Sequence, residues 1–154
     1  MVDRLSPEKR SELMTRVKRS NTKPELIVRR WLHARGWRYR LHVKDLPGTP
    51  DVVFPARKAA LFVNGCFWHG HNCRLGRLPS SRPEFWIPKM QANRERDLRK
   101  TNELLAKAWR VMTIWQCSLN EPEVVLTRIE DFLRSEIRVA EASGTVDLPR
   151  GNDA

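Results

Sequence analysis

Apolar and polar residues change their period along the chain, and these changes divide it into helical and extended segments. Residues 22–25 have the composition of a capping box with an early proline, so a helix is predicted to begin there and to end near Gly36. Residues 37–43 alternate between apolar and polar side chains, as a half-buried strand does. Residues 51–54 and 59–63 are short apolar runs that we expect to pair as a hairpin.

The second half of the chain is dominated by helical periodicity. Residues 82–108 are highly charged and predict a long helix, residues 109–115 a strand, and residues 122–137 an amphipathic helix. This order of elements predicts an α/β domain with a mixed sheet flanked by helices. We assign residues 21–137 to that domain, residues 1–20 to a basic N-terminal arm or helix, and residues 138–154 to a mobile tail.

The hairpin carries a geometric prediction. If its turn centres on Ala56 and Arg57, paired residues have numbers that sum to about 113, which places Asp51 opposite Phe62. The chain then leaves residue 63 directly into the segment 65–73, which is rich in cysteine and histidine. We therefore expect Asp51 and residues 63–69 to converge at one end of the sheet.

Charge and composition narrow the functional class. The net charge is +11, and residues 1–100 hold 23 Lys/Arg against 9 Asp/Glu, whereas residues 101–154 hold 6 against 9. A basic region of this size predicts a nucleic-acid partner. No apolar run approaches the roughly 20 residues of a membrane span. The polar residues 1–10 and three cysteines indicate a protein that is not exported and uses its thiols as ligands.

Three cysteines and one histidine have the composition of a closed structural zinc site. They are Cys66, His71, Cys73 and Cys117. His69 is an alternative fourth ligand, but alternation along the loop puts His71 on the same side as Cys73. The structural alternative is a set of buried thiols with incidental histidine neighbours. A bound zinc would fold a loop too irregular for an apolar core to hold.

A second site is predicted around Asp51, which follows the turn at residues 47–50. Phosphodiester hydrolysis needs charge stabilisation on the phosphate, and magnesium supplies it through one or two carboxylates and waters. His69 could accept a proton from the attacking water, and Glu25 could add a second acidic group. The alternatives are that Asp51 is only a turn residue and Glu25 only a helix cap.

Several segments together resemble the very-short-patch-repair (Vsr) DNA mismatch endonucleases. The segments are TKPEL at residues 22–26, LPGTPD at 46–51, FVNGCFWHGHNC at 62–73, RPEFW at 82–86, NRERD at 93–97, AWRV at 108–111 and WQC at 115–117. The resemblance runs in order from about residue 5 to residue 135, and its GCFWH segment is highly specific.

The resemblance implies a restriction-endonuclease-like fold with a zinc-stabilised loop. It implies a strand-specific nick on the 5′ side of the thymine in T:G mismatches left by 5-methylcytosine deamination, which starts very short patch repair. Magnesium would bind Asp51 and the backbone carbonyl of Val63, with His69 as the general base. The four zinc ligands would be those named above. The intercalating aromatics would be Phe67, Trp68 and Trp86.

This chain departs from the family at three positions. Asn64, Gly70 and Asn72 stand where the family often has histidine. Asn64 can bind water but cannot act as a base near neutral pH, so we expect His69 to carry that role alone. The other candidates for DNA contact are Lys89, Asn93, Arg94 and Arg96, besides Asn64 itself.

The resemblance also implies a partner and a location. We expect a monomer that acts on mismatched double-stranded DNA in the bacterial cytoplasm, at the nucleoid, with a mismatch-repair accessory protein as a possible partner. Two other functions fit the composition: a restriction-like endonuclease on intact duplex, and a non-catalytic zinc-stabilised DNA-binding module. Asp51 and His69 argue against the binding module, and the aromatic wedge favours mismatch nicking over a restriction-like cut.

Overall fold

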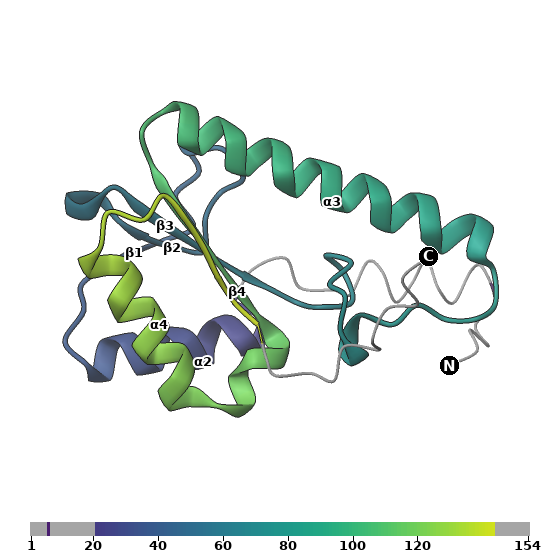
Figure 1. Ribbon diagram of the computed structural model, residues 1–154, viewed down its shortest axis with the longest axis horizontal. Coiled ribbons are helices and arrows are strands. Elements are labelled where there is room, and N and C mark those ends of the chain that lie inside the picture. The colour runs from purple at the N-terminus through teal and green to yellow at the C-terminus, as the bar shows by residue number, and fades with distance from the viewer. Residues whose placement is uncertain (1–5, 7–20, 144–154) are drawn as a thin grey trace.

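One mixed five-stranded sheet organises the protein (Figure 1). The structure is a computed structural model that describes residue 6 and residues 21–143. The strands are β1 (Arg40–Leu41), β2 (Val52–Phe54), β3 (Ala59–Asn64), β4 (Arg110–Trp115) and β5 (Val139–Ala142), and they lie in this order across the sheet. The predicted α/β class with a mixed sheet is confirmed. Within residues 21–143, no helix is long and apolar enough to cross a membrane.

The β2–β3 hairpin has the predicted register. Val52 pairs with Leu61 and Phe54 with Ala59, in antiparallel alignment. A short 3-10 turn at Pro55–Arg57 joins the strands, and Lys58 completes it with a left-handed φ of 51°. β3 and β4 run parallel, as do β4 and β5. Because β3 and β4 are parallel neighbours, the loops that leave their carboxyl ends start side by side.

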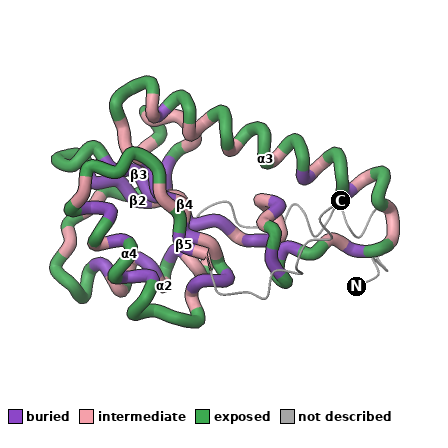
Figure 2. The backbone as a smooth tube through the Cα atoms, in the orientation of Figure 1, coloured by how far each residue is buried: buried purple, intermediate pink, exposed green. Residues whose placement is uncertain are grey.

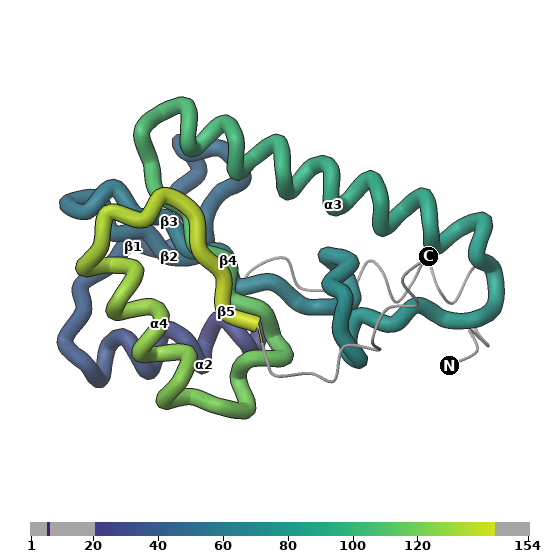
Figure 3. Tube along the Cα trace, viewed as in Figure 1, coloured from purple at the N-terminus to yellow at the C-terminus, as the bar shows by residue number. Residues whose placement is uncertain are grey.

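Helices cover both faces of the sheet (Figures 1 and 3). The helices α2 (Lys23–Ala34) and α4 (Pro122–Arg134) lie on one face and bury Leu32, Ile129 and other apolar side chains against the strands. On the other face, Leu104 near the end of α3 (Pro83–Ala106) packs with Ala60 and Val111. The rest of α3 extends past the sheet as a mostly exposed helix (Figure 2).

Two expectations about the ends of the elements are wrong. The strand predicted over residues 37–43 is only two residues long, because His42 adopts a left-handed φ of 45° and interrupts the extended backbone. The tail predicted from residue 138 does not leave the domain there, because Val139–Ala142 forms β5 and pairs with β4. Residues 144–154 of that tail, and the predicted arm at residues 1–20 apart from Ser6, lie outside the described residues.

Candidate metal centres

The thiol cluster is built by the parallel pairing of β3 with β4. Asn64 lies opposite Trp115 at the ends of these strands, and each strand is followed two residues later by a cysteine, Cys66 and Cys117. Cys117 lies in the 3-10 turn Gln116–Asn120. The loop after β3 then folds back through hydrogen bonds, so that the N–H of His71 reaches the carbonyl of Cys66 at 2.9 Å. Residues distant in sequence thereby meet in one place.

The four predicted zinc ligands form one group. The ligand atoms of Cys66, His71, Cys73 and Cys117 all lie within 4.8 Å of one another. The N–H of Cys117 donates to Cys66 Sγ at 3.3 Å, and His71 Nδ1 lies 3.6 Å from Cys117 Sγ. Ligands about 2.0–2.3 Å from a tetrahedral zinc lie about 3.3–3.8 Å apart, so this arrangement needs only small shifts to hold the ion.

Burial explains why this group suits a metal ion. The three cysteines are at most 6% exposed, and burial raises the pKa of the Cys66 thiol well above its ordinary value. Burial also lowers the pKa of His71, whose ring stacks on Trp115 with centroids 4.1 Å apart, so the imidazole stays neutral as a ligand must be. A cation would provide the positive charge that these buried thiolates need in order to form.

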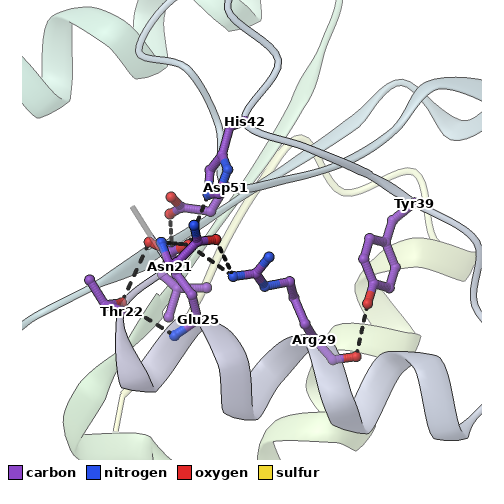
Figure 4. A network of polar contacts seen from close by, with 8 residues as sticks. Asn21, Thr22, Glu25, Arg29, Tyr39, His42 and Asp51 are labelled. Atoms are coloured by element: carbon purple, nitrogen blue, oxygen red, sulfur yellow. Dashed lines mark hydrogen bonds and ion pairs between the residues drawn. The ribbon is translucent and has the colours of Figure 1, made fainter. Parts of the chain in front are cut away.

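The second group surrounds Asp51 (Figure 4). The ligand atoms of Glu25, His42 and Asp51 lie within 4.8 Å of one another. Asp51 immediately precedes β2, and its Oδ2 accepts a 2.7 Å hydrogen bond from the N–H of Val63 in β3. The predicted convergence of Asp51 with residues 63–69 is therefore confirmed at Val63. It follows from the hairpin register, which brings residue 51 alongside residues 62 and 63.

Glu25 enters this group from the first turn of α2. Thr22 is the N-cap residue, and its Oγ1 accepts a 3.4 Å hydrogen bond from the N–H of Glu25. The Glu25 carboxylate turns back and accepts from the N–H of Asn21 at 3.1 Å, so the residue completes the capping arrangement. Glu25 is only 2% exposed. The helix cap and the acidic site residue were posed as alternatives for Glu25. The structure shows that its position is compatible with both.

Electrostatics make the Glu25–Asp51 pair a candidate cation site. The pKa of Asp51 is raised from 3.8 to about 7, chiefly by burial and in part by the nearby Glu25 carboxylate, against the opposing effect of the hydrogen bond from Val63. Two carboxylates held close together in a poorly solvated place repel each other when both are ionised. A divalent cation bound between them would remove that repulsion.

His69 does not belong to the Asp51 group. Its Nδ1 lies 2.6 Å from Asp97 Oδ2 on α3, a contact that fixes the orientation of the ring. On the same helix, Asn93 donates to the carbonyl of Trp68 at 2.9 Å and Arg94 donates to the carbonyl of Gly70 at 2.7 Å. We call residues 68–70 with these three α3 contacts the loop clamp. Helix α3 therefore holds three consecutive loop residues through Asn93, Arg94 and Asp97, which lie within about one helical turn of each other.

The predicted aromatic wedge forms a connected group. The Phe67 ring meets those of Trp68 and Trp86 edge to face, with centroids 4.9 Å and 5.3 Å apart. Phe67 and Trp68 are half-buried, whereas Trp86 is 5% exposed. Phe67 and Trp68 are therefore the more accessible members of this group, and the buried Trp86 packs against Phe67.

The remaining predicted DNA contacts fall into two sets. Lys89 and Arg96 lie on α3 with half-buried and exposed side chains, respectively. Asn93 and Arg94 instead use hydrogen-bond donors within the loop clamp, and Asn64 is 8% exposed at the end of β3. The sequence alone did not distinguish the α3 side chains that hold the loop from those that do not.

Two residues of the sites were missed from the sequence. His42 was placed in a strand, where its side chain had no predicted partner, and Asp97 was noted only as part of the segment 93–97. A signal for Asp97 did exist. Asn93 and Asp97 are four residues apart in a predicted helix, so they share a face, and that face could have been matched to the polar loop. His42 carried no such signal.

Comparison with known proteins agrees with this geometry. The family model described as DNA mismatch endonuclease Vsr matches residues 2–75. Type II nicking enzyme V.XorIIP of Xanthomonas oryzae pv. oryzae is 56% identical over 133 residues, which cover 86% of this chain and 98% of the relative. Type II nicking enzyme V.NmeAIP of Neisseria meningitidis is 37% identical over 87% of this chain and 96% of the relative.

A third relative carries the family's own name. DNA mismatch endonuclease Vsr of Escherichia coli K12 is 34% identical over 132 residues, which cover 82% of this chain and 85% of the relative. The chain belongs to the Vsr family of DNA mismatch endonucleases.

Proposed function

We propose that this protein is a magnesium-dependent endonuclease that nicks one DNA strand on the 5′ side of the thymine in a T:G mismatch. The product of 5-methylcytosine deamination is such a mismatch, and the nick would start very short patch repair. The observation that carries the proposal is the pair of the buried Glu25 and the half-buried Asp51 at the hairpin end that leads into the thiol-rich loop. Relatives named as nicking enzymes and as a mismatch endonuclease support it.

The residues around Asp51 would hold the catalytic magnesium. Asp51 would bind the ion together with the backbone carbonyl of Val63, the residue whose N–H already contacts its carboxylate. Glu25 would act beside them through water. When bound, magnesium stabilises the negative charge that develops on the phosphate and favours formation of the nucleophile.

His69 would be the general base. Its Nδ1 lies against the Asp97 carboxylate, which holds the ring in one orientation and favours the tautomer whose Nε2 can accept a proton. Nε2 would take that proton as the water oxygen forms a bond to phosphorus. The bond between phosphorus and the 3′ oxygen of the preceding deoxyribose would break, and that oxygen would take a proton from solvent water. Asn64 cannot share this task, since an amide is not basic near neutral pH.

The thiol cluster would hold zinc. Its ligands would be Cys66, His71, Cys73 and Cys117. The ion would have a structural role, because all four positions are filled by protein. It would fix the loop that carries Phe67, Trp68 and His69.

Recognition would begin at this rigid loop. Phe67 and Trp68 would enter the duplex beside the mismatch, with Trp86 behind them. A mismatched step costs less to unstack than a paired one, so the wedge itself favours damaged sites. Lys89 and Arg96 would contact the DNA backbone, and Asn64, Asn93 and Arg94 would contact it from the loop side.

We further propose a monomer that acts on mismatched double-stranded DNA at the nucleoid of a bacterial cytoplasm. Residues 21–143 carry one set of the proposed catalytic groups, which suits a single-strand nick. An accessory protein of mismatch repair is a possible partner under this proposal.

A strand-resolved nicking assay tests the proposal. Duplexes with a central T:G pair and randomised flanks, labelled differently on each strand, are compared with matched duplexes in magnesium. The proteins are wild type, Asp51→Asn and, as a matched control, Asp45→Asn at an exposed position. We expect a nick only beside the mismatched thymine, lost in Asp51→Asn and kept in Asp45→Asn.

Two other outcomes would overturn the proposal. Equal cutting of matched duplex would identify a restriction-like endonuclease. Binding without cutting in any flanking sequence would identify a zinc-stabilised binding module.

A further inference from the structure

His42 contacts both acidic residues of the candidate magnesium site (Figure 4). Its Nε2 lies 2.9 Å from Glu25 Oε2, and its backbone N–H donates to the carbonyl of Asp51 at 3.3 Å. We propose that His42 is a positioning residue of this site, which holds the Glu25 carboxylate in the orientation that metal binding at Asp51 requires. The inference rests on the proposed function, because it concerns the same metal site.

The backbone of His42 supports a dedicated role. Its φ of 45° is left-handed, a conformation that a non-glycine residue adopts rarely and at a cost in free energy. That conformation ends β1 after Leu41 and turns the imidazole toward the start of α2. The strand alternation predicted from the sequence would instead have continued through this residue. The strained backbone of His42 therefore occurs at the position where it brings the imidazole into contact with Glu25.

The Glu25 carboxylate needs a hydrogen-bond donor that fixes its orientation, because it lies beside the carboxylate of Asp51. Two carboxylates this close repel each other, and an unrestrained Glu25 would turn away from Asp51. The donors gather on Oε2, namely the N–H of Asn21 at 3.1 Å and His42 Nε2 at 2.9 Å, with Arg29 more distant at 3.9 Å. His42 is thus the nearest side chain holding that oxygen, which leaves the other oxygen for the metal site.

The other groups around His42 do not offer a substitute. Arg29 also donates to Asn21 Oδ1 at 2.7 Å, so its guanidinium is already engaged. The hydroxyl of Thr22 lies 3.5 Å from Glu25 Oε1, at the limit of a hydrogen bond, and it also caps the helix. Loss of the imidazole would leave the backbone N–H of Asn21, at 3.1 Å, to hold Glu25 Oε2, and the carboxylate should become less firmly oriented.

The test compares His42→Ala with His42→Gln, which keeps an N–H donor, and with His33→Ala as a control at an exposed histidine of α2. Two readouts are used: the magnesium concentration for half-maximal nicking of a T:G duplex, and Mn²⁺ binding without DNA by electron paramagnetic resonance. Zinc content and thermal unfolding confirm that each variant is folded.

We expect His42→Ala to weaken Mn²⁺ binding and to raise the half-maximal magnesium concentration by about tenfold, the effect of one lost charge-assisted hydrogen bond. His42→Gln should lie within about threefold of wild type, since the amide can donate to the same oxygen. His33→Ala should match wild type. Affinity for DNA in EDTA should stay unchanged in all variants, because the effect acts through the metal site.

Three results would overturn the inference. One is an unchanged metal dependence in folded His42→Ala, and another is a loss in His42→Gln as large as in His42→Ala. The third is a nitrogen hyperfine coupling on bound Mn²⁺ that vanishes in His42→Gln, since it would make His42 a direct ligand. Failure of wild type to nick overturns the proposed function instead, and Mn²⁺ binding still decides the role of His42.

Discussion

Arg94 Nε donates a hydrogen bond to the carbonyl oxygen of Gly70 across 2.7 Å. Gly70 has a left-handed φ of 62°, and a Cβ added there would lie 2.6 Å from the same Nε atom. The contact therefore requires glycine at position 70 for two reasons, backbone conformation and space. The guanidinium of Arg94 thus occupies the space that a side chain at position 70 would need.

Gly70→Ala should damage the loop clamp. The new methyl group would displace Arg94, and the left-handed backbone alone would cost about 1–2 kcal/mol. Gly36→Ala is a matched control, since Gly36 has a φ of 83° but nothing within 4 Å of an added Cβ. Urea unfolding should show a loss of stability in both variants. Nicking of T:G duplex should fall several-fold only in Gly70→Ala, and an equal effect in Gly36→Ala would contradict the role of the contact.

Asp97→Asn should slow the chemical step. The asparagine keeps the shape of the side chain but removes the charge that orients His69 and favours its protonated form during proton transfer. We expect the single-turnover rate to fall by about tenfold or more at saturating DNA, with DNA affinity unchanged. Glu95→Gln is the control, because Glu95 is exposed on the same helix and accepts a 3.3 Å hydrogen bond from Gln91, away from His69.

Equal rates for wild type and Asp97→Asn at saturating DNA would show that His69 needs no partner. A rate loss in Glu95→Gln as large as in Asp97→Asn would point to a general effect of charge on α3 rather than to His69.

The sequence predicted the features that depend on residues close together in the chain. The hairpin register followed from the position of one turn, and the capping turn of α2 from four residues, so the meeting of Asp51 with Val63 could be foreseen. The contact of His42 with Glu25 could not be foreseen, because the left-handed backbone of His42 breaks an alternation that otherwise favours a strand. β5 was missed because its pairing with β4 is a long-range contact, and residues 139–142 carry only a weak apolar pattern.

Removal of zinc should loosen the junction between β3 and β4. Cys117→Ser replaces one thiol of the buried cluster, so the ion loses a ligand and the remaining thiols lose the charge that balances them. We expect bound zinc, measured with a chromogenic chelator after unfolding, to drop from one equivalent toward none. The unfolding temperature should fall by several degrees.

Asp51→Asn serves as the control for the zinc experiment, since it belongs to the other cluster and should retain its zinc. Full zinc binding by Cys117→Ser would rule out Cys117 as a ligand.

The last prediction concerns pH and Asp51, whose pKa in the metal-free fold is raised to about 7 from 3.8, chiefly by burial. Between these two pH values the folded state binds more protons than the unfolded state, so stability falls as pH rises. Asn at this position cannot ionise. In EDTA, the unfolding free energy of Asp51→Asn relative to wild type should therefore increase from pH 5 to pH 8.

Magnesium should act in the opposite direction, because it binds the ionised form of Asp51. The half-maximal magnesium concentration should fall by about tenfold per pH unit as pH rises toward 7 and level off above it. Adding saturating magnesium at pH 8 should stabilise wild type and leave Asp51→Asn almost unchanged. A pH-independent difference between the two proteins in EDTA would mean that Asp51 is already ionised at pH 5, and the buried carboxylate pair would then be held apart by groups other than a metal ion.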